Sequence, residues 1–245
     1  GQVYTFRHAL IQEAVYATLL KRDRQRFHLQ VAQTVEDGDA WLLGERIEVL
    51  AYHYAESASP EKAIPHLIAA AENAARRCDY ETAVTRYQRA LSLVTLSGSE
   101  QHYDLLGMRI GLGRALKYTG KYGEASKVLE QALRDSLYLQ TKAGISQTMP
   151  QMVSGLTELA DIRHREGASE KAVDYLKASL TAIDSQGREA YLPLWRTVVD
   201  RLAWVRFQQG QLDAAYELAS SAASSVDLEQ AEDPITLASL YNTLG

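Results

Sequence analysis

The stretch Leu112–Leu133, L-G-R-A-L-K-Y-T-G-K-Y-G-E-A-S-K-V-L-E-Q-A-L, decides the fold. It places small residues at Gly113 and Ala125, where two helix backbones can approach closely, with Leu129 filling the space beside them. Gly120 lies between the two helical patterns and supplies a turn conformation that a side chain would resist. The stretch therefore predicts two antiparallel helices that meet at a tight turn.

The same arrangement recurs along the chain, with successive copies 42, 47 and 43 residues apart. The predicted turn residues are Cys78, Gly120, Gly167 and Gly210. The small residues of the first helices are Ala71, Gly113, Ala160 and Ala203, and those of the second helices are Ala83, Ala125, Ala172 and Ala215. A pattern repeated at near-constant spacing is typical of stacked helix pairs.

These copies resemble tetratricopeptide repeats, although they are longer than the usual repeat of about 34 residues. The resemblance implies an all-α fold, a right-handed α-solenoid of antiparallel helix pairs preceded by a small helical segment. We expect the helical end of a winged-helix or bridging segment at residues 1–58 and the repeats at 59–245. The expected repeats are 59–98, 99–149, 150–187, 188–232 and an interrupted fifth, 233–245.

Before the repeats, apolar residues at helical spacing predict three helices. The first runs over Phe6–Leu20, and the second carries Phe27, Val31, Ala32 and Val35 on one face and ends near Gly38. The third runs from about Gly44 to Ala58, with Ile47, Leu50, Ala51 and Tyr54 inward. Ser59 and Pro60 then predict a helix start, with a capping hydroxyl before a proline at the first helical position.

Composition limits the class of protein. Hydrophobic residues make up 46% and charged residues 23% of the chain, as in a soluble, well-packed protein. The net charge of -5 argues against a general nucleic-acid binder, and no apolar run approaches the roughly 20 residues that span a bilayer. Cys78 is the only cysteine, which suggests a reducing, cytoplasmic environment. Because the chain opens with Gly1 and closes on an unfinished repeat, we expect it to be a piece of a longer protein.

Catalytic patterns are absent from the sequence. It contains no His-Glu-x-x-His pair, no cysteine cluster and no Gly-x-Ser-x-Gly elbow, and Gly111–Gly113 is only half of a dinucleotide loop. Four scattered histidines fit helix surfaces or interfaces better than a metal site: His28, His53, His66 and His102. We therefore expect no enzyme activity, no metal and no cofactor in this fragment.

Two further segments carry a second resemblance. Phe6–Leu20 with its His8, and Leu50–Tyr54 followed by Pro60–Ala63, are similar to the end of the winged-helix region and the bridge to the repeat arm in signal-transduction ATPases with numerous domains. This group includes bacterial LuxR-type regulators with a large ATP-binding region and multidomain proteins that resemble adenylate cyclases. The resemblance covers about the first 95 residues.

That resemblance implies ATP or ADP in the parent protein, with His8 near the nucleotide phosphates as a sensor. The P-loop and the acidic magnesium-binding residues of the family have no counterpart in this chain. On the residues alone, His8 is a helix-start histidine without a ligand. The basic run from Lys21 to Arg26 fits a solvated face or an interdomain contact better than nucleic acid, because Asp23 interrupts it and no aromatic residue interleaves.

In a stack of this kind the first helix of each pair lines the concave side, and a row of arginine and aromatic residues there can bind a peptide. The repeat register places the following residues in this predicted groove: Glu72, Arg76, Arg114, Lys117, Tyr118, Asp161, His164, Arg165, Trp204 and Phe207. The alternative is that Trp204 and Phe207 pack between helices while the charges are merely solvated.

Two functions remain open. The first is a non-catalytic arm of a multidomain ATPase regulator, which binds a protein, a peptide or a small inducer and thereby controls a nucleotide switch or a transcriptional output. The second is a free-standing adaptor whose repeats bring protein partners together. Neither function calls for a membrane, and direct nucleic-acid binding is not expected.

Overall fold

The computed structural model describes residues 9–38, 43–98, 104–143 and 145–224, and these ranges are helical with no strand among them. The fold is therefore all-α, as predicted. The elements are α1 (Ala9–Thr18), α2 (Lys21–Asp37), α3 (Leu43–Ala55), the 3₁₀ helix η1 (Pro60–Ala63), α4 (Ile64–Arg76), α5 (Tyr80–Ser97), α6 (Leu105–Tyr118), α7 (Tyr122–Ala143), α8 (Ile145–Arg165), α9 (Ser169–Ser185), the 3₁₀ helix η3 (Arg188–Tyr191), α10 (Leu192–Gln208) and α11 (Leu212–Ser224).

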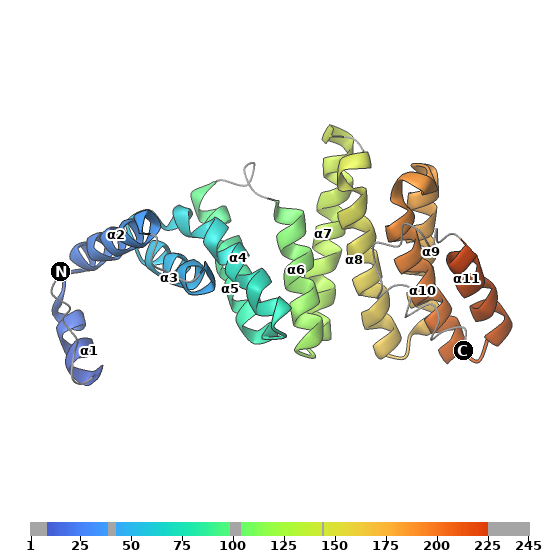
Figure 1. The fold of residues 1–245 in the computed structure, drawn as a ribbon, viewed down its shortest axis with the longest axis horizontal. Helices are drawn as coiled ribbons and strands as arrows, with labels where there is room; N and C mark the ends of the chain where they lie inside the picture. Colours follow the sequence, from blue (N-terminus) through green and yellow to red (C-terminus); the bar gives the residue numbers. More distant parts are fainter. Residues whose placement is uncertain (1–8, 39–42, 99–103, 144, 225–245) are drawn as a thin grey trace. The chain divides into compact units, whose positions relative to one another are not determined.

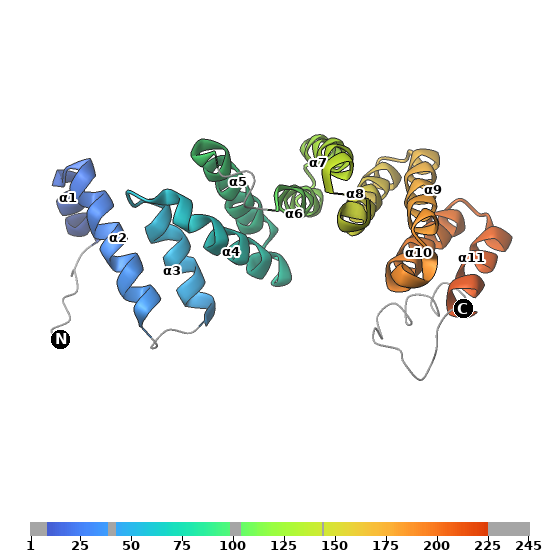
Figure 2. The same ribbon diagram turned by 90° about the horizontal axis from the view of Figure 1, so that it is seen from above.

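The chain forms two compact units, residues 1–108 and 109–245, and the division falls within α6. In the first unit α2 packs on α3, α3 on α4 and α4 on α5; Figure 2 shows α2 and α3 side by side ahead of α4. In the second unit α7 packs on α8, α8 on α9, α9 on α10 and α10 on α11 (Figure 1). The predicted boundary between residues 58 and 59 lies inside the first unit, and the predicted repeat limits stay predictions. No described helix combines the length and the apolarity needed to cross a membrane.

Each of four helix pairs has a turn between its first and second helix, and the four turns share one backbone geometry. The four predicted turn residues all have positive φ: Cys78 (60°), Gly120 (77°), Gly167 (80°) and Gly210 (74°). At the second turn the N–H of Gly120 donates to the Lys117 carbonyl at 3.1 Å and the N–H of Lys121 donates to the Leu116 carbonyl at 2.9 Å. The other three turns repeat both bonds at equivalent positions, which is the Schellman pattern that satisfies the last carbonyls of a helix.

The small residues of the pattern lie at the helix contacts. All seven alanines among them are no more than 3% exposed, and Gly113 is also buried. A Cβ atom added to Gly113 would lie 2.5 Å from Cγ of Leu129 on α7, so only glycine lets α6 approach α7 this closely. The positions equivalent to Gly113 and Leu129 in the first unit are Ala71 and Tyr87, and both residues are buried. The close approach predicted from Leu112–Leu133 is thus confirmed.

The segment before the repeats departs from the predicted pattern at three places. Phe27 and Val31, predicted on the apolar face of α2, are 43% and 40% exposed, and Val15, in the apolar pattern of α1, is 46% exposed. Their helices do form, but the apolar stripe is only partly covered. Ser59 makes no capping hydrogen bond with its side chain, and Pro60 begins η1 rather than an α-helix. Residues 1–8 and 225–245, which hold His8 and the predicted fifth repeat, lie outside the described residues.

Candidate functional site

In the second unit the first helices of the pairs, α6, α8 and α10, are joined by charged side chains. Arg114 Nε lies 2.7 Å from Glu158 Oε1, and Lys117 Nζ lies 2.6 Å from Glu158 Oε2 and 2.8 Å from Asp161 Oδ2. Arg201 Nη1 of α10 reaches the same Asp161 oxygen at 2.5 Å. We call these five residues the ion network: Arg114, Lys117, Glu158, Asp161 and Arg201. It connects three successive helix pairs on one face.

The centre of the ion network, Lys117 and Glu158, is withdrawn from solvent, whereas Arg114 and Arg201 at its ends are more exposed. The Lys117 side chain is 1% exposed and the Glu158 side chain 7% exposed. Burial by itself raises the pKa of Asp161, but the charges of Arg201 and Lys117 and their hydrogen bonds outweigh it, so that the pKa falls below its usual value. Lys117 was predicted to face a partner in the groove, and this is wrong, because its ammonium is buried between two carboxylates. Its role is to hold α6 against α8.

Aromatic side chains stand beside this network on the same helices. Trp204 and Phe207 of α10 are 49% and 45% exposed, and their rings stack with centroids 5.7 Å apart. They do not pack between helices, contrary to the alternative considered for them. Tyr118 of α6 is 50% exposed, and the Lys117 ammonium lies 4.7 Å from its ring centroid. Three exposed aromatic rings therefore lie on the same helices as the ion network.

The remaining predicted groove residues divide between the two units. In the second unit Arg114 and Arg165 are exposed, and His164 is half-buried with its Nδ1 3.1 Å from the Ser169 hydroxyl. In the first unit Glu72 and Arg76 of α4 are exposed and line a cavity of about 420 Å³ between α3 and α4. Arg76 also donates to the Asn73 side chain.

Glu158 and Arg201 are the residues that the sequence analysis missed. They occupy equivalent register positions 43 residues apart, three residues before Asp161 and Trp204. One signal in the sequence could have identified them. Consecutive repeats carry opposite charges at the same register position, and this position lies one helical turn before a predicted groove residue. The prediction considered only one row of residues on each helix, and the ion network runs diagonally between two rows.

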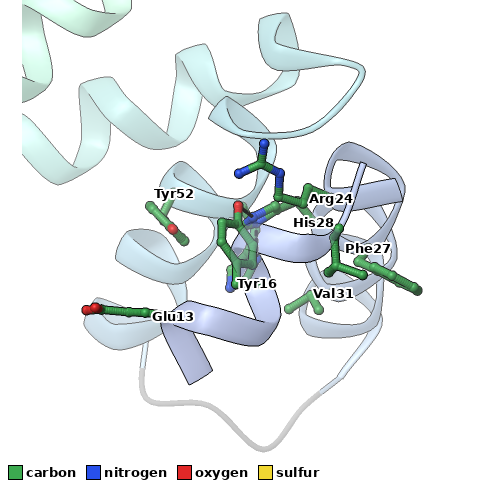
Figure 3. Close-up of a pocket in the computed structure, with 9 residues that line it drawn as sticks. Glu13, Tyr16, Arg24, Phe27, His28, Val31 and Tyr52 are labelled. Carbon is green, nitrogen blue, oxygen red and sulfur yellow. Dashed lines mark hydrogen bonds between the residues drawn. The ribbon is translucent and has the colours of Figure 1, made fainter. Parts of the chain in front are cut away.

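The first unit carries a different polar cluster, between α1, α2 and α3. Figure 3 shows Tyr16 of α1 beside His28 of α2 at the centre of a cavity of about 540 Å³. The Tyr16 hydroxyl lies 2.8 Å from His28 Nε2, and His28 Nδ1 lies 2.9 Å from His53 Nδ1 of α3. The Tyr52 ring meets both imidazoles edge-on. We call Tyr16, His28, Tyr52 and His53 the imidazole cluster.

Burial sets the ionisation of the imidazole cluster. Burial lowers the pKa of His28; the charge of Glu56 opposes this shift and the charge of Arg24 adds to it. Burial also lowers the pKa of His53, and the neighbouring His28 lowers it further. Burial also raises the pKa of Tyr52. His28 and His53 thus have specific partners that their spacing did not predict, whereas His102 lies outside the described residues. Within the described ranges, no group of three histidine, cysteine or carboxylate side chains is arranged to hold a metal ion.

Comparison with known proteins agrees with this architecture. A family model described as tetratricopeptide repeat matches residues 63–135. The chain is 28% identical over 109 residues to Protein KINESIN LIGHT CHAIN-RELATED 1 of Arabidopsis thaliana, a match that covers 44% of this chain. It spans only 17% of the length of that relative.

Solved structures show the same fold at lower identity. A crystal structure of Podosopora anserina putative kinesin light chain nearly identical TPR-like repeats is similar with a TM-score of 0.58 and 20% identity, covering 83% of this chain and 93% of that one. A variant of the same protein gives a TM-score of 0.60. BtubC (BKLC) from P. vanneervenii gives 0.58 at 16% identity, covering 89% of this chain and 81% of that one.

The matched repeats include the pairs α4–α5 and α6–α7, which carry the turns and small residues described above. The chain therefore contains a tetratricopeptide-repeat region similar to the repeats of kinesin light chain-like proteins, and such repeats imply a protein-interaction scaffold.

Proposed function

We propose that this chain is a protein-interaction scaffold whose α6–α8–α10 face binds an extended or helical segment of a partner protein. The observation that carries the proposal is the exposed, stacked pair Trp204 and Phe207 beside the ion network. Large aromatic side chains are the commonest anchors of protein interfaces. A face that is fixed by internal ion pairs offers them in one arrangement, which reduces the ordering cost of binding.

The charges of this face indicate the chemistry of the partner. The carboxylates of Glu158 and Asp161 are already compensated by Lys117 and Arg201 within the ion network. On this face the exposed arginines of the predicted row are Arg165 and Arg114, of which Arg114 also pairs with Glu158. A segment that presents apolar side chains to the aromatic pair and carboxylates to these arginines is therefore the best fit.

The test uses fluorescence anisotropy with labelled twelve-residue peptides that combine apolar and acidic residues, and with matched peptides in which lysine replaces each acid. We expect the acidic peptides to bind at least tenfold tighter, and the double variant Trp204→Ala/Phe207→Ala to lose about tenfold or more in affinity, as truncated interface anchors do. Tyr216→Ala is the matched control, because Tyr216 is 62% exposed on α11, outside this face. Circular dichroism verifies that helicity is kept. Equal binding by the wild type and a folded double variant would refute the proposal.

A second candidate, the regulatory arm of a multidomain ATPase, is favoured by the resemblance of Phe6–Leu20 and Leu50–Tyr54 to the bridge of such proteins. In it, partner or inducer binding would bias a nucleotide switch only if the ligand bound the open and closed forms with unequal affinity. Sequencing the parent gene upstream of Gly1 tests this candidate. A strand followed by Gly-x-x-x-x-Gly-Lys-Ser/Thr would support it. Upstream repeats without such a motif would favour the free-standing adaptor.

A further inference from the structure

The cavity between α1, α2 and α3 has the dimensions and the lining of a small-molecule site. Its volume of about 540 Å³ lies within the range that is usual for such sites, roughly 300–1,000 Å³. Two aromatic side chains of its wall, Phe27 and Tyr52, are 43% and 52% exposed. This exposed aromatic surface is a cost to the free protein that a flat apolar ligand would remove.

The floor of the cavity is ordered before any ligand binds. Tyr16, His28 and His53 form a continuous hydrogen-bonded chain across three helices, and edge-on ring contacts hold the same groups in place. These hydrogen bonds fix the Tyr16 hydroxyl and the His28 imidazole on the floor of the cavity. Pre-formed walls of this kind reduce the entropy that binding costs.

The lining of the cavity carries one guanidinium, Arg24, and one carboxylate, Glu13, and Glu56 acts on His28 and Tyr52 from nearby. Arg24 lines it and lies over the Tyr16 ring at 5.2 Å, and the same first turns of α2 also carry Lys21, Arg22 and Arg26. Asp23, the acid of this run, is paired with Arg26 at 3.1 Å. Glu13 is the carboxylate in the lining, and in Figure 3 it lies at the edge of the cavity, away from Arg24. The cation that the lining offers to a ligand beside the aromatic floor is the guanidinium of Arg24.

We propose that this cavity binds a small molecule with an aromatic ring and an anionic group, with the ring against Tyr16 and Tyr52 and the anion on Arg24. Guanidinium groups bind carboxylates by paired, charge-assisted hydrogen bonds, and an aromatic wall adds selectivity for planar rings. The site is separate from the peptide-binding face proposed above, since its residues all belong to the first unit.

The test uses the full chain and two probes of the same shape, 2-naphthoate and the 2-naphthylmethylammonium cation, in titration calorimetry. We expect 2-naphthoate to bind one site per chain, at least tenfold tighter than the cation. Arg24→Gln should weaken 2-naphthoate by about tenfold or more, as the loss of a charge-assisted hydrogen bond does, and should leave the cation unaffected. Arg24→Lys should retain part of the affinity because it keeps the charge.

Two further variants separate the ring contact from general effects. Tyr52→Ala should weaken both probes, because it removes aromatic surface without changing the charge. Arg134→Gln, an exposed arginine of the second unit, should change neither affinity. Equal affinities for the anion and the cation, an unaltered 2-naphthoate affinity in folded Arg24→Gln, or no detectable binding at millimolar 2-naphthoate would each overturn the proposal.

Discussion

The two units are built from similar helix pairs, but they use their inward polar side chains in opposite ways. In the second unit the ion network consists of charged groups, and each of its carboxylates has a basic partner on another first helix. In the first unit the imidazole cluster consists of neutral or weakly ionising rings that border an open cavity. In helix pairs of similar design, polar residues thus join helices in the second unit and line a cavity in the first.

Lys117→Met should destabilise the second unit most. It removes the buried ammonium and leaves Glu158 without its closest partner, and breaking a buried ion pair costs several kcal/mol. Because Arg114 still contacts Glu158 and Arg201 still contacts Asp161, we expect a loss of about 2–3 kcal/mol in the free energy of unfolding. Urea denaturation measures it, with the exposed Lys127→Met on α7 as the control. If Lys117→Met unfolds at the same urea concentration as the control, the ion network does not hold the helices together.

Gly113→Ala should destabilise the α6–α7 pair by about 1–3 kcal/mol, because the added methyl group would overlap Leu129. The matched control is Gly123→Ala on α7, where a Cβ would meet no atom within 4 Å and where alanine should stabilise the helix by up to about 0.5 kcal/mol. Thermal unfolding of the two variants gives opposite shifts if the close approach is real.

Cys78→Gly should stabilise the first unit by about 1 kcal/mol, since a side chain in the left-handed region is strained and glycine is not. Gly120→Ala in the second unit makes the reverse change at the equivalent turn and should destabilise by a similar amount. Denaturant unfolding of both variants is the measurement. Shifts of the same sign would show that the two turns are not equivalent.

Acidification should loosen the first unit before the second. Burial holds the pKa of His28 and His53 below that of an unfolded histidine, about 6.5, so the unfolded chain binds more protons and stability falls as the pH drops below that value. In the second unit the pKa of Asp161 is held below 3.8, so its contribution is complete above that value and is lost only as the pH falls through the lower, folded-state pKa. We expect this to be the smallest effect, because the cavity leaves the imidazoles near solvent.

Hydrogen exchange with mass spectrometry, corrected for intrinsic rates, resolves the two units at pH 7.5 and pH 5.5. Protection should fall in α1–α3 and stay constant in α8–α10. His53→Gln is the control, because a side chain that does not ionise should reduce the pH dependence of the first unit. Loss of protection in both units at the same pH would contradict the assignment.

The backbone fold was largely predictable from the sequence. A turn with positive φ and a close contact between helices each favour particular residues, and these residues recur at fixed spacing. Gly120 and its three equivalents were recognisable by spacing alone, and all four have the backbone conformation that this position requires. The exposure of Val15 and Phe27 was not predictable in the same way. Helical spacing shows which residues share a face, but not whether another element covers that face.

Side-chain pairing was the less predictable part of the candidate site. Trp204 and Phe207 were identified because aromatic residues stand out at a groove position. Lys117 was placed on the same row, yet it is buried, and its ammonium pairs with the carboxylates of Glu158 and Asp161 on the next first helix. Such contacts join residues about 44 positions apart, and no local pattern encodes them.

The ion network also bears on how the second unit deforms. Its bonds connect α6 to α8 and α8 to α10, whereas a cluster of buried apolar side chains packs α8, α9 and α10 together. Bending that spreads the α6–α8–α10 face must separate opposite charges, while bending that closes it leaves them together. We therefore expect the second unit to resist bending that opens this face more strongly than bending that closes the face around a bound segment.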